Sequence, residues 1–270
     1  MPELPEVETT CRGLIPHVVG RRVTAVTVNQ ACLRIPVPDS LDELIGQRID
    51  GIHRRAKYLV FETAKGRMVI HLGMSGSLRI CDATMPPRKH DHVVLGLESG
   101  LEMRFHDPRR FGLVDWTGGE WLEMRWFKNL GPEPLTENFD VAYLIVAAKG
   151  RKIPVKSFVM SNQVVVGVGN IYACEALFLA GIHPKRAAGK VSRARLEGLV
   201  GAIKDRLAAA IESGGTTLRD FVREDGQPGY FKQELMAYGR EGEPCRKCKT
   251  TIKRCVIGQR STFYCANCQR

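Results

Sequence analysis

Short segments in which apolar and polar residues alternate fill the first half of the chain. In residues 21–29 the alternation places Val23, Ala25 and Thr27 on one face of a strand. Similar segments follow, with glycines between several of them, at residues 56–63, 67–74, 90–98 and 100–106. Many short strands at this spacing predict an antiparallel sandwich or barrel.

Beyond residue 130 the apolar positions recur at the period of a helix. Residues 130–140 (LGPEPLTENFD) contain two prolines and a glycine and are typical of a domain junction. Residues 192–215 predict a long helix, with Ser192 as its N-cap and Gly214 as its end. Its apolar face consists of Leu196, Leu199, Val200, Ile203, Leu207 and Ile211. A shorter helix is predicted in residues 172–182, ending at Gly181.

The first residues, MPELPEVETT, also suit a helix start. Pro5 is favourable at the first helical position, and Glu6 and Glu8 complement the positive end of the helix dipole. This pattern leaves Pro2 and Glu3 without a structural explanation.

Length and composition indicate a protein of about two domains with an ordinary core, since 44% of the 270 residues are hydrophobic. No apolar run is long enough to cross a membrane, and the N-terminus does not resemble a secretory signal. We therefore expect a cytoplasmic protein. The 40 Lys and Arg residues against 29 Asp and Glu give a net charge of +11, which favours a polyanionic partner, most often nucleic acid. A merely basic protein without such a partner is an equal alternative on charge alone.

Four of the nine cysteines form a C-x2-C-x16-C-x2-C pattern near the C-terminus. Two CxxC turns can bring four thiolates to one tetrahedral point, so the pattern predicts one structural zinc ion. Cys255 lies between the two turns and is an alternative ligand, although it has no CxxC partner. The predicted zinc ligands are Cys245, Cys248, Cys265 and Cys268.

Several motifs resemble those of the formamidopyrimidine-DNA glycosylase family, in order, over effectively the whole chain. They are PELPEVE, RRAKYL, HLGMSGSL, DPRRFG, GVGNIYACEALF and QRSTFYC. The resemblance implies an α+β multidomain fold: an N-terminal antiparallel β-sandwich domain (1–130), a linker (131–136), a helix–two-turn–helix DNA-binding domain (137–235) and a C-terminal zinc finger (236–270). It also implies a monomeric bacterial enzyme of base-excision repair that removes oxidised purines such as 8-oxoguanine from double-stranded DNA and then cleaves the strand.

The resemblance assigns catalytic roles to four residues. Pro2 would be the nucleophile, through the secondary amine that is exposed when the initiator methionine is removed, and Glu3 would donate a proton to the opening sugar. Lys57 would assist β-elimination, although without the resemblance it is an ordinary solvated lysine. Arg260 would act in δ-elimination and grip a phosphate, which suits a guanidinium better than proton donation does. Glu6 is expected to hold the helix start.

The resemblance also assigns residues to DNA binding. Met74, Arg109 and Phe111 would fill the gap left by the extruded base. Without the family, Met74 and Phe111 would be core residues, but the neighbouring glycines favour exposed turns. Phosphate contacts are expected from His71, His90, Arg109, Arg151 and Asn170. Selection among oxidised purines is expected to depend on a loop near Gly214–Phe231.

Alternatives remain at this point. A related endonuclease excises oxidised pyrimidines with the same fold, but its start usually reads PEGPE, where this chain has Leu4. A non-catalytic zinc-finger protein that binds DNA is the second alternative. A metal site at His90 and His92 has no evident third ligand, and GVGNIY does not complete a dinucleotide-binding motif because Tyr172 stands where the third glycine would fall. Asn162 replaces the aspartate that is commoner in the family.

Overall fold

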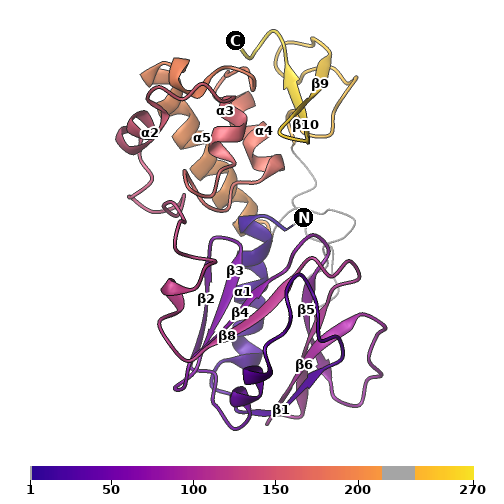
Figure 1. Cartoon of the computed structure of the whole chain (residues 1–270). Coiled ribbons are helices and arrows are strands. Elements are labelled where there is room, and N and C mark those ends of the chain that lie inside the picture. Colours follow the sequence, from indigo (N-terminus) through magenta and orange to yellow (C-terminus); the bar gives the residue numbers. More distant parts are fainter. Residues whose placement is uncertain (1, 215–234) are drawn as a thin grey trace. The chain divides into compact units, whose positions relative to one another are not determined.

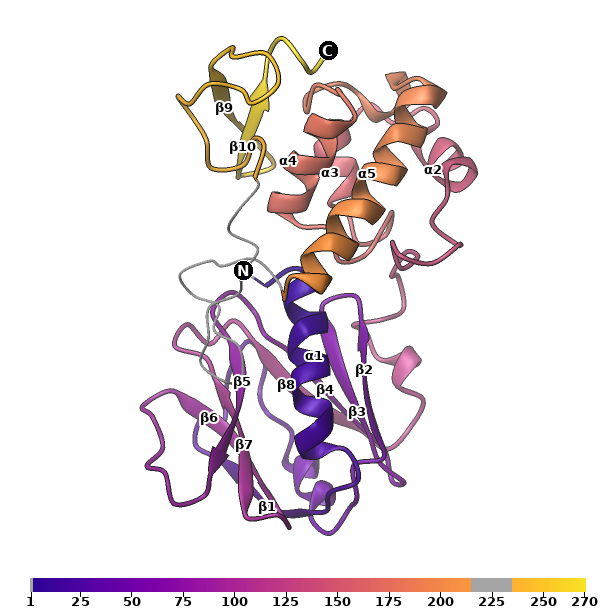
Figure 2. The ribbon, with the colours of Figure 1, turned by 180° about the vertical axis from the view of Figure 1, so that it is seen from behind.

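The computed structural model describes residues 2–214 and 235–270. Their contacts divide them into two units, one built mainly from residues 2–128 and one from residues 129–212 and 235–270. Figures 1 and 2 show the elements of each unit from opposite sides. No helix among the described residues is long and apolar enough to cross a membrane.

The first unit contains two four-stranded antiparallel sheets, with strand orders β1-β6-β7-β5 and β2-β3-β4-β8. Apolar side chains from both sheets form one core, as the predicted N-terminal β-sandwich requires. The elements are α1 (Leu4–Val18), β1 (Val23–Val28), η1 (Asp39–Leu44), β2 (Gly51–Arg55), β3 (Tyr58–Glu62), β4 (Arg67–His71), β5 (Ser77–Asp82), β6 (Asp91–Leu97), β7 (Leu101–His106), β8 (Leu113–Thr117) and η2 (Trp121–Glu123).

Helix α1 joins the sandwich core through one apolar face. Val7, Cys11 and Leu14 are all buried in the cluster that fills the sandwich. Each fully buried side chain of this kind contributes roughly 1.5–3 kcal/mol relative to an exposed one. The helix begins at Leu4, one residue earlier than the position of Pro5 suggests, so residues 2 and 3 directly precede its first turn.

The strand prediction was incomplete in two respects. In β1 the pairing with β6 shifts between Val23 and Ala25, so the strict alternation fails and Ala25 is exposed while Val26 packs against the core. A bulge of this kind adds a residue to one strand and reverses the faces beyond it. Strands β2, β5 and β8 were missed, because GIHRR, SLRICD and LVDWT mix charged residues with apolar ones without regular alternation.

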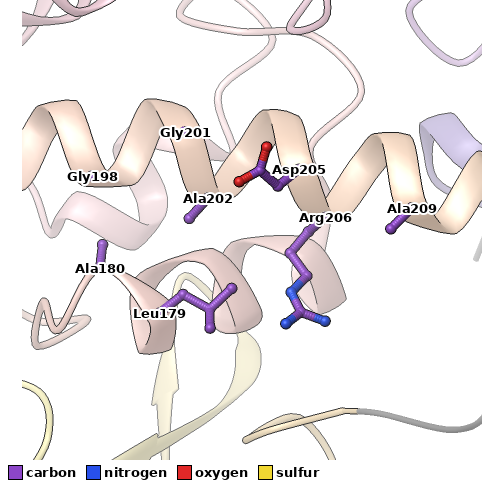
Figure 3. Close-up of a pocket in the computed structure, with 8 residues that line it drawn as sticks. All are labelled: Leu179, Ala180, Gly198, Gly201, Ala202, Asp205, Arg206 and Ala209. Atoms are coloured by element: carbon purple, nitrogen blue, oxygen red, sulfur yellow. The ribbon is translucent and has the colours of Figure 1, made fainter.

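The second unit consists of helices and a two-stranded hairpin. Its elements are α2 (Val141–Ala148), α3 (Val155–Val159), α4 (Asn170–Leu179), η3 (Ala188–Lys190), α5 (Arg193–Glu212), β9 (Ile252–Ile257) and β10 (Arg260–Cys265). All six apolar positions predicted on the long helix are buried in α5. Small residues of α5, including Gly198, Gly201 and Ala202, line a groove beside Leu179 and Ala180 at the end of α4 (Figure 3).

The hairpin packs against the helices through α4. Phe178 lies in one apolar cluster with Ile252 of β9 and the buried thiols of Cys245 and Cys265. The α4 helix is therefore buried on nearly all sides and connects the helical core to the cysteine-rich hairpin. The architecture confirms the predicted α+β fold with a sandwich, a helical part and a C-terminal four-cysteine module.

Candidate active site and nucleic-acid interface

Pro2 and Glu3 are buried at the N-terminal end of α1. Glu3 is the N-cap and forms a capping box with Glu6. In this arrangement the Glu6 carboxylate accepts a hydrogen bond of 2.8 Å from the backbone N–H of Glu3. Glu6 thus fixes the backbone directly after Pro2, which agrees with the structural role expected for it. The nitrogen of residue 2 lies at the positive end of the α1 dipole, which disfavours protonation of the amine that removal of Met1 exposes.

Lys57 lies in the two-residue turn between β2 and β3. The preceding residue, Ala56, has a φ of 55°, and its carbonyl accepts a 3.0 Å hydrogen bond from Arg54. Arg54 also forms a 2.8 Å ion pair with Glu8 of α1, so the hairpin is attached to the first turns of the helix. Figures 1 and 2 both show the start of α1 and the turn between β2 and β3 at the same end of the sandwich.

The buried carboxylate of Asp107 holds together the two loops that carry the predicted wedge residues. One oxygen accepts from Ser75 Oγ at 3.0 Å, and the other accepts from the backbone N–H of Gly112 at 2.8 Å. Gly73 has a φ of +67° and lies so close to the backbone of Phe111 and Gly112 that a Cβ would be 2.4 Å from it. The loop of Met74 and the loop of Arg109 and Phe111 therefore lie side by side.

The side chains of these loops are available at the surface. The Phe111 side chain is 46% exposed, and the Arg109 guanidinium lies 4.9 Å from the centre of its ring. Met74 is half-buried. The loops place these residues on exposed turns rather than in the core, and a large apolar residue beside an arginine at a surface is suited to contact with bases.

His71 and His90 lie beside the same loops. The backbone N–H of Asp107 donates to the His90 carbonyl at 3.0 Å, and a Cβ on Gly112 would be 2.7 Å from the carbonyl of His71. Burial, followed by the charges of Lys57 and Arg34, lowers the pKa of His71 to about 3. The neutral His71 ring accepts at Nδ1 from the Gly73 N–H at 3.0 Å, so its proton is on Nε2.

The pair of His90 and His92 does not form a metal cluster. The rings are 5.7 Å apart, and His92 is buried with Nε2 at 2.9 Å from the Asp107 carbonyl. Among the described residues, the four-cysteine group is the only cluster of His, Cys, Asp and Glu that could hold a metal ion. His92 is a structural residue that supports the Arg109 loop.

In the second unit, Lys156 connects Asn170 to the hairpin. Its buried ammonium donates to Asn170 Oδ1 at 2.5 Å and to Thr262 Oγ1 at 2.6 Å, and Asn170 Nδ2 donates to the Ser261 carbonyl at 2.9 Å. Arg260, the residue before Ser261, is exposed at the start of β10. The start of α4 and the start of β10 thus present Asn170 and Arg260 together.

Arg151 lies in the connection after α2 and contacts a different segment. Its side chain is exposed, and its carbonyl accepts from the Gly189 N–H at 2.9 Å. The structure therefore gathers His71, Met74, His90, Arg109 and Phe111 in the first unit, and Asn170 with Arg260 in the second, while Arg151 is next to η3. The lesion-selecting loop expected near Gly214–Phe231 lies outside the described residues from 215 onward.

Three residues that organise the site were not identified from the sequence. Asp107 lies in the DPRRFG motif, but the motif assigned it no role. No motif marked Lys156 as a contact of Asn170. Arg34 is far along the chain from the loops that it contacts. The backbone N–H of Arg34 donates to the Gly112 carbonyl at 3.0 Å, and its guanidinium lies 6.0 Å from the Trp126 ring. Arg34 therefore adds a cation to the same end of the sandwich as His71.

The four predicted zinc ligands converge. Their sulfur atoms all lie within 4.8 Å of one another, with Cys245–Cys268 at 3.9 Å and Cys248–Cys265 at 3.4 Å. Four sulfurs around zinc at about 2.3 Å form a tetrahedron with edges of about 3.8 Å. The thiolate set fits one structural Zn²⁺, and Cys255, opposite Thr262 in the hairpin, is not in the cluster.

Protonation of the cysteines opposes metal binding. Hydrogen bonds from Thr250 and Asn267 lower the pKa of Cys248 to about 5, whereas burial raises the pKa of Cys268 to about 12. Zinc must displace the protons that remain on the thiols, so its affinity for the site falls as the pH is lowered.

Three family models match the chain in order. They are the formamidopyrimidine-DNA glycosylase N-terminal domain (residues 1–114), its H2TH domain (130–222) and the zinc finger found in FPG and IleRS (242–270). The second match supplies the helix–two-turn–helix identity of the helical part.

Curated relatives and solved structures agree over the full length. Formamidopyrimidine-DNA glycosylases of Alteromonas mediterranea and Methylococcus capsulatus are 53% and 56% identical, each covering 100% of both chains. The MutM (FPG) crystal structure from Thermus thermophilus has a TM-score of 0.90 at 38% identity, covering 99% of this chain and 98% of that one. A Lactococcus lactis FPG mutant in complex with Fapy-dG containing DNA has a TM-score of 0.92 at 31% identity, covering 100% of both. The chain belongs to the formamidopyrimidine-DNA glycosylase family.

Proposed function

We propose that this chain is a bifunctional DNA glycosylase and AP lyase of base-excision repair that removes 8-oxoguanine and formamidopyrimidines. Full-length similarity to enzymes of that name supports the reaction, and solved relatives are bound to DNA that contains Fapy-dG or an abasic site. The observation that carries the assignment in this structure is the buried Pro2–Glu3 pair, fixed by Glu6 at the start of α1.

The neutral Pro2 amine attacks C1′ of the damaged nucleotide as the bond from C1′ to the base breaks. The base leaves with the bonding electrons and takes up a proton, and Glu3 protonates the ring oxygen of the sugar as it opens. The product is a cationic iminium that joins Pro2 to C1′. This cation draws electrons from C2′ and makes its proton acidic.

Loss of the C2′ proton expels the 3′ phosphate, and a second elimination expels the 5′ phosphate. Lys57, in the turn beside the α1 start, is assigned to the β-elimination. Arg260 binds a phosphate and stabilises its charge during δ-elimination. Its exposure at the start of β10 leaves the guanidinium accessible to a phosphate.

The loops held by Asp107 fill the duplex behind the extruded nucleotide. Met74 and Phe111 act as apolar wedges, and Arg109 hydrogen-bonds the base left without a partner. His71 and His90 beside them, and Asn170 and Arg151 in the second unit, contact phosphates. Neutral His71 does so as a donor through Nε2–H, which adds no charge of its own.

The remaining assignments extend the same proposal. The partner is double-stranded DNA with an oxidised purine, one zinc ion holds the C-terminal hairpin, and the enzyme acts as a monomer in the bacterial cytoplasm. The domain limits 1–130, 131–136, 137–235 and 236–270 belong to this proposal as well.

Excision assays with two lesions test the assignment. We expect strand cleavage of a duplex with 8-oxoguanine opposite cytosine to be faster than cleavage of a matched duplex with thymine glycol. The variant Glu3→Gln should lose about 100-fold or more in rate, while Glu98→Gln, which changes an exposed carboxylate, should retain activity. Preferential cleavage at thymine glycol would instead assign the chain to oxidised pyrimidines, and binding without cleavage would support a non-catalytic role.

A further inference from the structure

An open pocket of about 550 Å³ lies where the segment after α4 meets the last residue of the chain. The backbone N–H of Arg270 donates to the Gly181 carbonyl at 3.1 Å, and Arg195 donates to the Arg270 carbonyl. We call this feature the basic pocket. It is lined by His183, Lys185, Arg186, Ala187, Lys190 and Arg270.

The cations of the basic pocket lack acidic side-chain partners in the part of the chain that the structure describes. Among the described residues, none of Lys185, Arg186, Lys190 and Arg270 forms an ion pair with a carboxylate, whereas Arg54, Arg79 and Arg104 elsewhere all do. Burial and then the charges of Lys185 and Arg186 lower the pKa of His183. Like charges gathered without counter-charges destabilise a surface unless an anion binds there.

The basic pocket is continuous with the residues assigned to DNA. The Arg186 carbonyl accepts from the backbone N–H of Val155 at 2.7 Å, and the next residue along, Lys156, contacts Asn170 and Thr262. At the other side of the pocket, the Gly189 N–H donates to the carbonyl of Arg151. Phosphate-contact candidates therefore flank the pocket on two sides.

The spacing also suits a duplex. Asn170 is at the first residue of α4 and the pocket lies beyond its last residue, and a helix of ten residues is about 15 Å long. That length corresponds to roughly four to five nucleotides along a DNA strand at about 3.4 Å each. A separation of that size is within the reach of one duplex.

We propose that the basic pocket binds a backbone phosphate of duplex DNA outside the segment contacted by Asn170 and Arg260. The pocket thereby extends the protein's footprint on undamaged DNA. Continuity with Asn170 and Arg151 favours duplex DNA over an acidic segment of a partner protein. This inference rests on the proposed function only in taking DNA as the ligand, since the pocket does not contribute to base excision.

The test uses the zinc-loaded full chain and an undamaged 40-base-pair duplex. The variant pair is Lys185→Gln with Lys190→Gln, both exposed in the pocket region. The matched control is Arg21→Gln with Lys65→Gln, which removes the same charge from exposed positions in the first unit. Fluorescence anisotropy measures affinity from 50 to 200 mM KCl, and single-turnover cleavage of an 8-oxoguanine duplex is measured in parallel.

Loss of one to two phosphate contacts in K185Q/K190Q makes the fall of log affinity with log salt shallower, by about 0.9 to 1.8 in slope. We expect about tenfold weaker binding of that variant at 50 mM KCl, with the control within about twofold of the unmodified chain and cleavage unchanged in both. Equal losses of duplex affinity in both double variants would show that only the net charge of the protein matters, and would overturn the proposal. An unchanged duplex affinity, with loss of binding to an octaglutamate peptide in K185Q/K190Q alone, would also overturn it and assign the pocket to acidic protein segments. Failure of the unmodified chain to cleave would refute the proposed function, while the binding comparison would still decide the pocket.

Discussion

His71 shows how a single residue is adapted to its position. Its ring is half-buried beside Lys57 and Arg34, and its Nδ1 accepts from the Gly73 backbone at 3.0 Å. A protonated ring would lose that hydrogen bond and place a third positive charge in the group. The neutral form is therefore the folded form, and its remaining Nε2–H is a donor.

This arrangement makes stability depend on pH. The pKa of His71 is about 3 in the folded state and 6.5 in the unfolded state, so the unfolded chain binds more protons between these values. The contribution of His71 to stability is therefore complete above pH 6.5 and is lost progressively as the pH falls from 6.5 toward 3. In His71→Asn, Oδ1 can still accept from Gly73 without titrating.

We expect urea unfolding to show that the unmodified chain loses roughly 1–2 kcal/mol more than His71→Asn between pH 7 and pH 5. Measurement of both proteins at each pH separates this residue from the other histidines. Equal losses in the two proteins would contradict a neutral His71.

Some site residues could be identified from the sequence and others could not. The difference is how far along the chain their contact partners lie. Pro2 and Glu3 were identified from the sequence because a helix start explains Pro5 and Glu6 but gives Pro2 and Glu3 no role. Asp107 and Lys156 were missed as organising residues because their partners are far apart in the chain: Asp107 with Ser75, and Lys156 with Asn170 and Thr262. Pairings of that kind follow from tertiary structure and leave no periodic signal.

At the scale of elements, the interface between α4 and β10 is built on a buried charge. Lys156 is fully buried, and its ammonium bonds to Asn170 and Thr262 while Asn170 bonds to Ser261. A buried ammonium is tolerated only when its donors are satisfied. The group fixes the start of α4 relative to the start of β10, where Arg260 is presented.

Lys156→Met keeps an unbranched side chain, one heavy atom shorter, and removes the donor, leaving buried acceptors unpaired. We expect a loss of roughly 2–4 kcal/mol in unfolding free energy, at about 1–3 kcal/mol for each unsatisfied group. Duplex binding should weaken as well, because Asn170 and Arg260 lose their common support. The control Lys152→Met changes an exposed lysine nearby and should alter stability by less than about 0.5 kcal/mol.

Urea unfolding and anisotropy on zinc-loaded protein measure both effects. If Lys156→Met were as stable as Lys152→Met, the buried contacts of Lys156 would have no organising role.

Periodicity predicted the elements to different extents. The apolar stripe of α5 was correct at all six positions, because a twenty-residue helix repeats its pattern over several turns. Strands β2, β5 and β8 were missed, since five or six residues that include charged positions give too short a pattern. In β1 the shift between Val23 and Ala25 depends on its pairing with β6, which the sequence of the strand itself does not encode.

At the scale of the whole molecule, the C-terminal hairpin is too small to have an extensive core of its own. Its apolar cluster shares Phe178 of α4, and two of the four sulfur ligands lie inside that cluster. A structural zinc ion contributes directly to folding in modules of this size. Loss of zinc is therefore expected to affect duplex binding through Arg260 rather than through the sandwich.

Cysteine variants test the assignment of the metal site. Cys248→Ser should lose bound zinc and weaken duplex binding, whereas Cys255→Ser should retain one zinc per chain because Cys255 is outside the cluster. Zinc content by mass spectrometry and duplex affinity by anisotropy give the two results. Loss of zinc in Cys255→Ser would show that Cys255 is a ligand.

The central claim is that the amine of Pro2 becomes bonded to the damaged nucleotide. Borohydride added during the reaction with a duplex carrying 8-oxoguanine opposite cytosine reduces the iminium to a stable protein–DNA adduct. The unmodified chain in this test is the one that has lost Met1. A variant that retains one residue ahead of Pro2 is treated in parallel, because acylation of the proline nitrogen removes its nucleophilicity. Peptide mass spectrometry then locates the adduct. The account requires an adduct on Pro2 in the unmodified chain and no adduct on Pro2 in the extended chain, whereas an adduct on another residue, or binding without any adduct, would contradict it.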